Sequence, residues 1–519
     1  MRPLILLLPL AACTHQSIVL DTGGGDSPGE DTQPVDTAPD SIPTVSSANC
    51  TVRNAGSPYG TEGRSLSVTY GCDEAPGAVL TVLNLPTGAS FAANTLTWTP
   101  TLDQAGRYDL DLRAEIDGEQ AIAAATVWVA DGWDDPDNIE VDPLVYTEEF
   151  GVPVMNLEVP PGTNYTTDTA ASLYWQGHQY AVGVQYRGAS SSYYPKHSFV
   201  VAFSTDDEFD APGWHHRRNI NITSTFDDNA YLRQKTCYDL WTALSDTHPV
   251  FQTKMVALYL NNQYEGLQLI TDHIDGEWEH DNGLNEAGNL YKAIDHSANL
   301  DVRFNGARKS SLHQGYEKKS GDPDDWTDLD DLVKFIATSD SPTFSADLDT
   351  WISRDDFMYW WVFVRFVDGA DSAGKNSYLY HDPADATSIW RYAPWDFNDS
   401  MGQDWETIRV SADDSYDYSG NNKFFERALA DPTMSADLTA RMRAALDGPF
   451  AKDAILARLD DDYAEIDPEA RRDWQKWKQQ YDEYWGWRGD DLQDYDGEVA
   501  YLRAWVSDRW DYLDQVTGP

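Results

Sequence analysis

Three polar side chains in the second half of the chain have the types and spacing needed to move a proton and hold a metal ion. Asp371 is followed five residues later by Asn376, and Asp396 comes twenty residues further on. A carboxylate can orient a hydroxyl group and accept its proton, whereas an amide oxygen and a second carboxylate are hard ligands that Mg²⁺ accepts. The spacing alone is a weak signal, because an Asp and an Asn five residues apart also occur in a polar turn that caps a helix and a strand.

The elements predicted around these residues would bring them together. Residues 356–366 are nearly all apolar and predict a buried helix that ends shortly before Asp371. Strands predicted at 378–380 and 390–393 form a hairpin, with Asp396 just after it. In protein kinases a catalytic Asp is likewise followed five residues on by an Asn, and a hairpin then delivers a metal-binding Asp.

Other familiar chemistry is absent from the sequence. The chain has no GxGxxG, Walker lysine loop, nucleophile elbow, HExxH, CxxC or Cys/His zinc spacing. Its net charge of −50 argues against a nucleic-acid partner, because a phosphate backbone would be repelled. The same acidity would attract a basic protein substrate, or it serves only solubility in a saline medium.

The N-terminus predicts export and a lipid anchor. Residues 1–13 combine a positive start, an apolar run too short to span a bilayer, and the sequence LAAC, which is typical of a lipobox. Cys13 would carry the lipid, although an ordinary secretory signal ending in a cysteine is the alternative. Because Thr14 is not an acidic retention residue, we expect placement in the outer membrane of a cell that has two membranes.

Two segments have the composition of linkers. Residues 14–47 are rich in Gly, Pro, Asp, Ser and Thr, which predicts a disordered acidic tether. Residues 131–142 form a carboxylate-dense joint; a solvated linker is favoured over calcium binding, because the spacing of a calcium loop is absent.

Residues 48–131 predict an all-β domain of short alternating strands, among them 107–114 and 121–129. The stretch at 85–112, LPTGASFAANTLTWTPTLDQAGRYDLDL, resembles the repeat of bacterial putative-Ig sandwich domains. That resemblance implies an Ig-like spacer, with carbohydrate or protein binding as the alternative. Cys50 and Cys72 lie in this one domain of an exported chain, which favours a disulfide between them.

Residues 146–434 predict a mixed α/β domain, and 435–519 predict its helical C-terminal part. A helix is expected at 228–243, and the Asn261–Asn262 pair predicts a hairpin turn. The Asp467–Pro468 pair predicts the start of a helix. The predicted strands of this region are 152–159, 180–186, 199–203, 255–260 and 265–271.

From about residue 154 onward the chain resembles the CotH (spore-coat protein H) kinase family. The resemblance rests on six segments in order: RGASS (187–191) followed by Pro195 and Lys196, DNAYLRQK (228–235), VALYLNNQYEGLQLITDHID (256–275), LYK (290–292), DSAGKNSYLY (371–380) and WDFNDSMG (395–402). It implies a multidomain protein in which the all-β sandwich precedes an α+β atypical protein-kinase-like domain with a helical C-terminal extension. It also implies an ATP- and Mg²⁺- or Mn²⁺-dependent kinase that phosphorylates Ser or Thr of secreted or surface proteins.

The same resemblance implies roles for single residues. Asp371 would orient and deprotonate the acceptor hydroxyl, while Asn376 and Asp396 would hold the metal. Lys196 would bind phosphate and face both carboxylates across one cleft. The remaining residues expected at the nucleotide are Ser190, Ser191, Lys292 and Lys375. The serines could instead form a solvated hairpin tip, and Lys292 could be a salt-bridged strand residue.

Three departures from the family pattern keep other functions open. Asn398 replaces the second carboxylate of W-D-x-D, His197 replaces a second lysine, and Asp272 replaces a glutamate. Loss of an anionic ligand could weaken metal binding, so a catalytically inactive, kinase-like surface binding or structural protein is the alternative function. A glycoside hydrolase is less favoured, because the tryptophans fall mostly at helical core spacing rather than around a carboxylate pair.

Overall fold

The computed structural model describes residues 50–116, 119–132, 142–163, 166–188, 190–484 and 492–518. The predicted signal peptide with Cys13, the predicted linker and most of the acidic joint lie outside the described residues, as does the side chain of Ser190. Within the part of the chain that is described, no helix is long and apolar enough to cross a bilayer.

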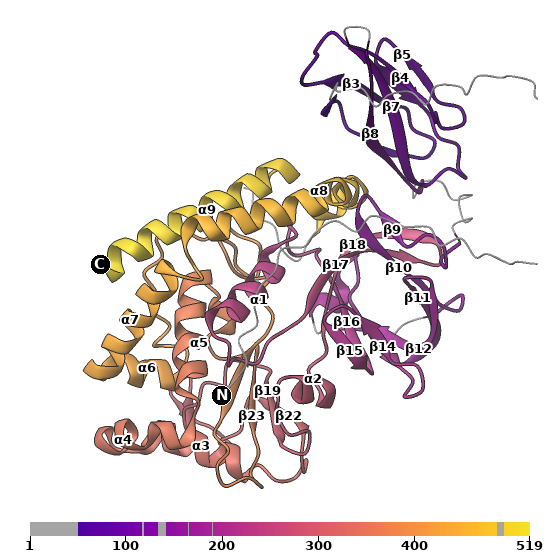
Figure 1. Ribbon diagram of the computed structural model, residues 1–519. Coiled ribbons are helices and arrows are strands. Elements are labelled where there is room, and N and C mark those ends of the chain that lie inside the picture. The colour runs from indigo at the N-terminus through magenta and orange to yellow at the C-terminus, as the bar shows by residue number, and fades with distance from the viewer. Residues whose placement is uncertain are drawn as a thin grey trace, which may run out of the picture. The chain divides into compact units, whose positions relative to one another are not determined.

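Residues 52–130 form two four-stranded β-sheets that share one hydrophobic core (Figure 1). Strand β7 alternates buried and exposed side chains, so Leu110 and Leu112 point into the core. A disulfide joins Cys50 to Cys72, with Cα atoms 5.0 Å apart. The first sheet has the order β1 (Val52–Ala55), β3 (Leu66–Cys72), β6 (Thr95–Trp98), β5 (Ser90–Ala92), and the second β2 (Tyr59–Thr61), β8 (Glu119–Ala130), β7 (Gly106–Ile116), β4 (Val79–Val82).

The next sheet closes on itself. Its order is β11 (Thr169–Trp175), β12 (His178–Tyr186), β13 (Phe199–Phe203), β16 (Asn219–Ser224), β18 (Gln263–Asp272), β17 (Thr253–Leu260), β10 (Val152–Glu158), β9 (Glu148–Glu149). Because β10 also pairs with β11, seven of these strands form a ring. Apolar side chains such as Trp175, Val201 and Ile222 form a core of this barrel, joined by Trp214 from the hairpin of β14 (Phe209–Ala211) and β15 (Trp214–Arg217).

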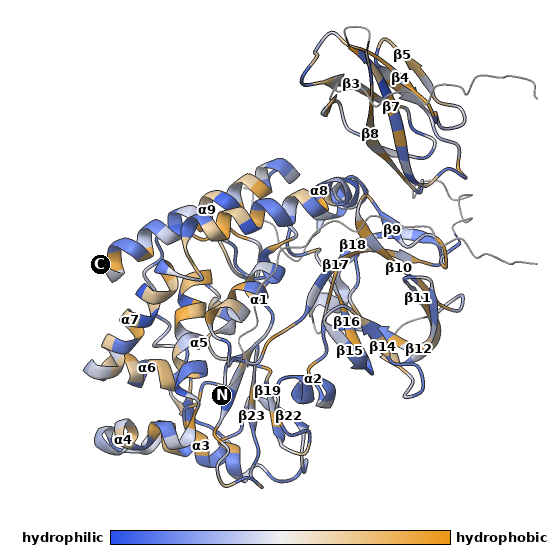
Figure 2. Ribbon diagram, viewed as in Figure 1, coloured by the Kyte–Doolittle hydropathy of each residue, from blue (hydrophilic) through white to orange (hydrophobic). Residues whose placement is uncertain are grey.

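A four-stranded sheet and the helices surround the largest core of the molecule. The sheet has the order β22 (Tyr316–Ser320), β19 (Asn289–Ala293), β23 (Ser377–His381), β24 (Arg391–Pro394). The helices are α1 (Arg233–Leu244), α2 (Gly276–Asp281), α3 (Thr327–Thr338), α4 (Ser341–Trp351), α5 (Arg354–Val367), α6 (Lys423–Ala430), α7 (Pro432–Asp447), α8 (Lys452–Glu483) and α9 (Tyr495–Thr517), with a small hairpin of β20 (Arg303–Phe304) and β21 (Ala307–Arg308). Helices α8 and α9 lie side by side (Figure 1), and α9 alternates hydrophilic and hydrophobic segments along its length (Figure 2).

Two predicted helix boundaries are wrong. Helix α1 begins at Arg233 rather than at residue 228, because the Asp228 carboxylate accepts the backbone N–H groups of Ala230 and Arg233 and holds this stretch as a turn. Helix α8 runs through Pro468 instead of starting there. The Asp467 carboxylate pairs with Arg471 one turn later and does not cap a helix start. Buried residues of α8 occur on both sides of the proline.

Candidate active site

Asp371, Asn376 and Asp396 lie together where the β23–β24 hairpin meets the end of α5. The side-chain amide of Asn376 donates to Asp371 Oδ2 over 2.8 Å. The backbone N–H of Trp395 donates to the Asn376 carbonyl, and Ser372 Oγ donates to the carbonyl oxygens of Trp395 and Asp396. The hairpin register therefore places the start of β23 and the residues after β24 against the turn that carries Asp371.

Two of these residues have strained backbones. Asn376 has φ of 53° and Asp396 has φ of 65°, both in the left-handed region. Asn and Asp adopt this region more readily than other non-glycine residues, but it still costs free energy that the surroundings must offset. Such conformations recur where a side chain is aimed at a ligand, and both proposed metal ligands have one.

The site holds more carboxylates than the sequence pattern indicated. Burial, and then the neighbouring charge of Asp371, raises the pKa of Asp396. Burial raises the pKa of Asp399, and the neighbouring charges of Asp371, Asp227 and Asp396 raise it further. Burial raises the pKa of Asp227 to about 7, and the charge of Asp396 is the second cause of this shift. Each shift has the sign that a bound cation would reverse.

Two cationic or titratable neighbours contact Asp371 directly. Lys375 Nζ lies 2.8 Å from Asp371 Oδ2, and His296 Nε2 lies 3.5 Å from Oδ1. Asp371 thus sits between an amide, an ammonium and an imidazole, with its side chain 20% exposed. This exposure leaves its carboxylate accessible to solvent.

These side chains are of the types that bind a divalent cation, but they are not arranged as a complete metal site. Among the described residues, no three His, Cys, Asp or Glu side chains are arranged to hold a metal ion. Asn376 and Asp396 nevertheless offer hard oxygen ligands beside Asp399, in a cluster whose mutual repulsion a divalent cation would relieve. Loading the site would require these side chains to turn toward one ion.

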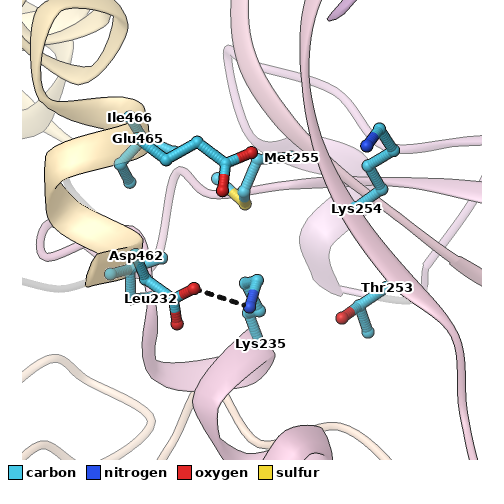
Figure 3. Close-up of a pocket in the computed structure, with 8 residues that line it drawn as sticks. All are labelled: Leu232, Lys235, Thr253, Lys254, Met255, Asp462, Glu465 and Ile466. Atoms are coloured by element: carbon cyan, nitrogen blue, oxygen red, sulfur yellow. Dashed lines mark hydrogen bonds and ion pairs between the residues drawn. The ribbon is translucent and has the colours of Figure 1, made fainter. Parts of the chain in front are cut away.

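A separate cavity of about 150 Å³ lies between α1, the start of β17 and α8 (Figure 3). Lys235 is paired across it with Asp462 over 3.0 Å. The lining contains none of the predicted site residues: it consists of Leu232, Lys235, Thr253, Lys254, Met255, Asp462, Glu465 and Ile466.

Comparison with known proteins identifies the family. A family model described as CotH kinase protein matches residues 184–513, more than half of the chain. This chain belongs to the CotH kinase family. A relative, the inner spore coat protein H of Bacillus subtilis (strain 168), is 22% identical over 334 residues, which cover 64% of this chain and 86% of that protein.

The CotH match includes every residue discussed at the site, and it also includes the position where this chain departs from the W-D-x-D pattern. Asn398 Nδ2 donates to Asp227 Oδ2 over 2.9 Å and to Asp399 Oδ1 over 2.8 Å. A neutral amide therefore bridges two carboxylates. With Asn398 in that role, Asp227 and Asp399 are the carboxyl groups that remain near Asp396.

The lysine of the CotH P-K segment is fully buried in an ion pair. Lys196 Nζ lies 2.5 Å from Asp473 Oδ2 on α8 and also donates to Thr225 Oγ1 and the Leu267 carbonyl. Burial lowers the pKa of Lys196, and the Asp473 carboxylate opposes this shift. Among the described residues, no hydrogen bond or ion pair joins Lys196 to Asp371 or Asp396; its partners are Asp473, Thr225 and Leu267.

The turn of the CotH R-G-x-S-S segment is tightly built. Gly188 has φ of 105°, a backbone conformation that strains any other residue, and a Cβ there would displace the Ser191 hydroxyl, which lies 1.9 Å from its position. The backbone at 190–193 forms a 3₁₀ turn in which the Tyr194 N–H donates to the Ser191 carbonyl. Lys292 projects from β19 with Nζ 5.8 Å from the Trp395 ring centre.

Sequence reasoning missed three residues here. Asp227 directly precedes the DNAYLRQK segment, and a doubled aspartate before a family motif was an available signal. His296 follows the LYK segment by four residues, in a loop without a motif. Asp473 carries no local signal, because its partner Lys196 is 277 residues away.

Proposed function

We propose that this chain is an exported, lipid-anchored protein kinase that transfers the γ-phosphoryl group of ATP to Ser or Thr of exported or surface proteins. The observation that carries the proposal is the hydrogen-bonded Asp371–Asn376 pair beside the strained, partly buried Asp396. Membership of the CotH kinase family supports it. The cell-envelope location rests on the N-terminal lipobox with Cys13.

Asp371 would orient the acceptor hydroxyl and take its proton. The acceptor oxygen forms a bond to the γ-phosphorus while the bond from phosphorus to the bridging oxygen breaks, and ADP leaves with that electron pair. Asn376 and Asp396 would hold Mg²⁺ or Mn²⁺, with Asp399 as a further anionic group. The metal would supply positive charge that offsets the charge of the phosphates.

The test is autophosphorylation, and phosphorylation of basic model proteins, with labelled ATP. Asp371→Asn and Asp396→Asn should each lower incorporation by at least a hundredfold, since each removes a charge but keeps the shape. Asp385→Asn, at the exposed opposite end of the β23–β24 hairpin, is the matched control and should behave as wild type. Equal incorporation by all four proteins would refute the catalytic assignment.

A kinase-like binding protein without catalysis is the second candidate, and Asn398 favours it. This protein would show no incorporation under any metal. ATP with Mg²⁺ at 100 times its dissociation constant would stabilise a nucleotide-binding fold by about 2.7 kcal/mol. A wild-type protein with neither incorporation nor this stabilisation would support the second candidate.

The lipid anchor has its own test. Replacement of Cys13 by Ser should move the protein from the membrane fraction to the soluble fraction.

A further inference from the structure

A second cavity, of about 410 Å³, shares no lining residue with the carboxylate cluster at Asp371. Residues of the β-sandwich, from the turn at 102–107 and from β8, form one side of it. Residues 142–148, which end in β9, form the other side. Small-molecule sites have volumes of roughly 300–1,000 Å³ and often lie where two domains meet. The cavity is therefore large enough for a small organic ligand.

Apolar side chains line this cavity although solvent reaches them. Val145 is 76% exposed and Leu102 is 38% exposed. The rings of Trp128 and Tyr146, both half-buried, belong to the same lining. Contact between water and exposed apolar side chains is unfavourable, and a ligand that covers them gains free energy. The lining thus suits a ligand that has an apolar part.

Most charged groups of the lining are carboxylates. Asp103, Asp142 and Glu148 are exposed, and among the described residues none of the three forms an ion pair. Glu62, the fourth carboxylate, is buried and accepts the backbone N–H of Gln104 over 2.7 Å. Like charges repel, so this lining disfavours phosphates and carboxylates as ligands and attracts a cation.

Arg107 is the one cation among the described residues of the lining, and it has its own partner. Its Nε atom lies 3.0 Å from Asp109 Oδ1, and its Cζ atom lies 5.3 Å from the Trp128 ring centre. A cation over an aromatic face is attracted by the electrons of the ring. Because Arg107 pairs with Asp109, which lies outside the lining, the three exposed carboxylates keep their charge for a ligand.

We propose that this cavity binds a free organic cation, an alkylamine or alkylguanidine with an apolar stem. The stem would lie on Leu102 and Val145, and the cationic group would meet Asp103, Asp142 and Glu148. A concave site of this volume encloses a small molecule more fully than it does a segment of a partner protein. The proposal is independent of phosphotransfer, because it uses none of the residues assigned to that reaction.

The test is calorimetric binding of the diamine cadaverine to the full chain, without nucleotide or metal. Wild type should bind it, and more weakly as salt rises. Glutarate carries two carboxylates on the same five-carbon chain, and pentanediol carries no charge; neither should bind. Wild type that does not bind cadaverine, or that binds pentanediol equally well, would overturn the proposal. Binding of an acetylated lysine peptide without binding of cadaverine would also overturn it, because the occupant would then be a partner chain.

Variants locate the binding on the protein. Asp103→Asn combined with Glu148→Gln should weaken cadaverine binding about tenfold, because two exposed charges are lost. Asp111→Asn combined with Glu115→Gln, which alters two exposed carboxylates of β7 outside the lining, is the matched control and should bind as wild type does. Val145→Lys would place a cation of the chain itself in the cavity and should prevent binding. The exposure of Val145 makes this change compatible with folding, which the melting temperature checks. Equal binding by Val145→Lys and wild type would reveal a diffuse attraction to the acidic surface and overturn the proposal.

Discussion

Asp473 on helix α8 holds Lys196 of the barrel region in an ion pair that is completely buried on both sides. The same carboxylate accepts hydrogen bonds from the Leu267 backbone and from the hydroxyls of Tyr231 and Tyr481. One side chain thus joins the C-terminal helices to the barrel. The stability of the molecule should depend on it.

Asp473→Asn should lower the free energy of unfolding by about 3–5 kcal/mol, because it leaves the Lys196 charge buried without its counter-charge. Denaturant unfolding followed by tryptophan fluorescence measures this. Asp496→Asn is the control, since Asp496 pairs with Arg471 in the open, with 69% of its side chain exposed, and should cost less than about 1 kcal/mol. Similar losses in the two variants would contradict the assigned role of Asp473.

Asn398→Asp should make stability more dependent on metal. The new carboxylate would face Asp227 and Asp399, which Asn398 now bridges, so the melting temperature should fall without metal. With Mg²⁺ or Mn²⁺ it should rise further than in wild type, because one more anionic ligand is present. Asn398→Ala removes the bridge without adding charge and should show no added response. A metal response equal in all three proteins would place the ion elsewhere.

Glu469→Gln should stabilise the protein at alkaline pH. Burial raises the pKa of Glu469 from 4.5 to about 8. The folded protein therefore keeps a proton that the unfolded chain releases, and stability falls as pH rises from about 4.5 to 8. Glutamine removes this loss, so the variant should match wild type near pH 4 and exceed it by a few kcal/mol, at about 1.4 kcal/mol per pKa unit, near pH 9. Glu465→Gln, exposed on the same helix, should follow wild type throughout.

Cys50→Ser should lower the stability of the β-sandwich by about 3 kcal/mol, because the unfolded chain loses a cross-link between residues 22 apart. Differential scanning calorimetry with and without reductant measures this. Reductant should lower the melting temperature of wild type but not of Cys50→Ser. Cys237→Ser, which replaces a buried free thiol, should keep the full response to reductant.

Local patterns in the sequence predicted much of the fold. The Asn261–Asn262 pair predicted the β17–β18 turn, and both residues have the positive φ that a tight hairpin turn requires. The apolar run at 356–366 became the buried helix α5. Both predictions depend on neighbouring residues alone.

Features set by distant contacts could not be predicted in this way. Asp431–Pro432 starts helix α7, where Asp431 accepts from the backbone of Thr433 and Met434. Asp467–Pro468 has the same two residues yet lies inside α8. The difference lies in what packs around each pair. The neutralisation of Lys196 by Asp473 escaped prediction for the same reason.

The closed ring of seven strands has a consequence for how the protein behaves among its neighbours. A strand from another chain can extend a sheet only at an unpaired edge, and the pairing of β10 with β11 removes that edge from the ring. The open four-stranded sheet keeps an edge at β22, where Lys318 and Lys319 make an unfavourable template. At the ring and at β22, the fold is therefore protected against strand addition by a neighbouring chain at high local concentration.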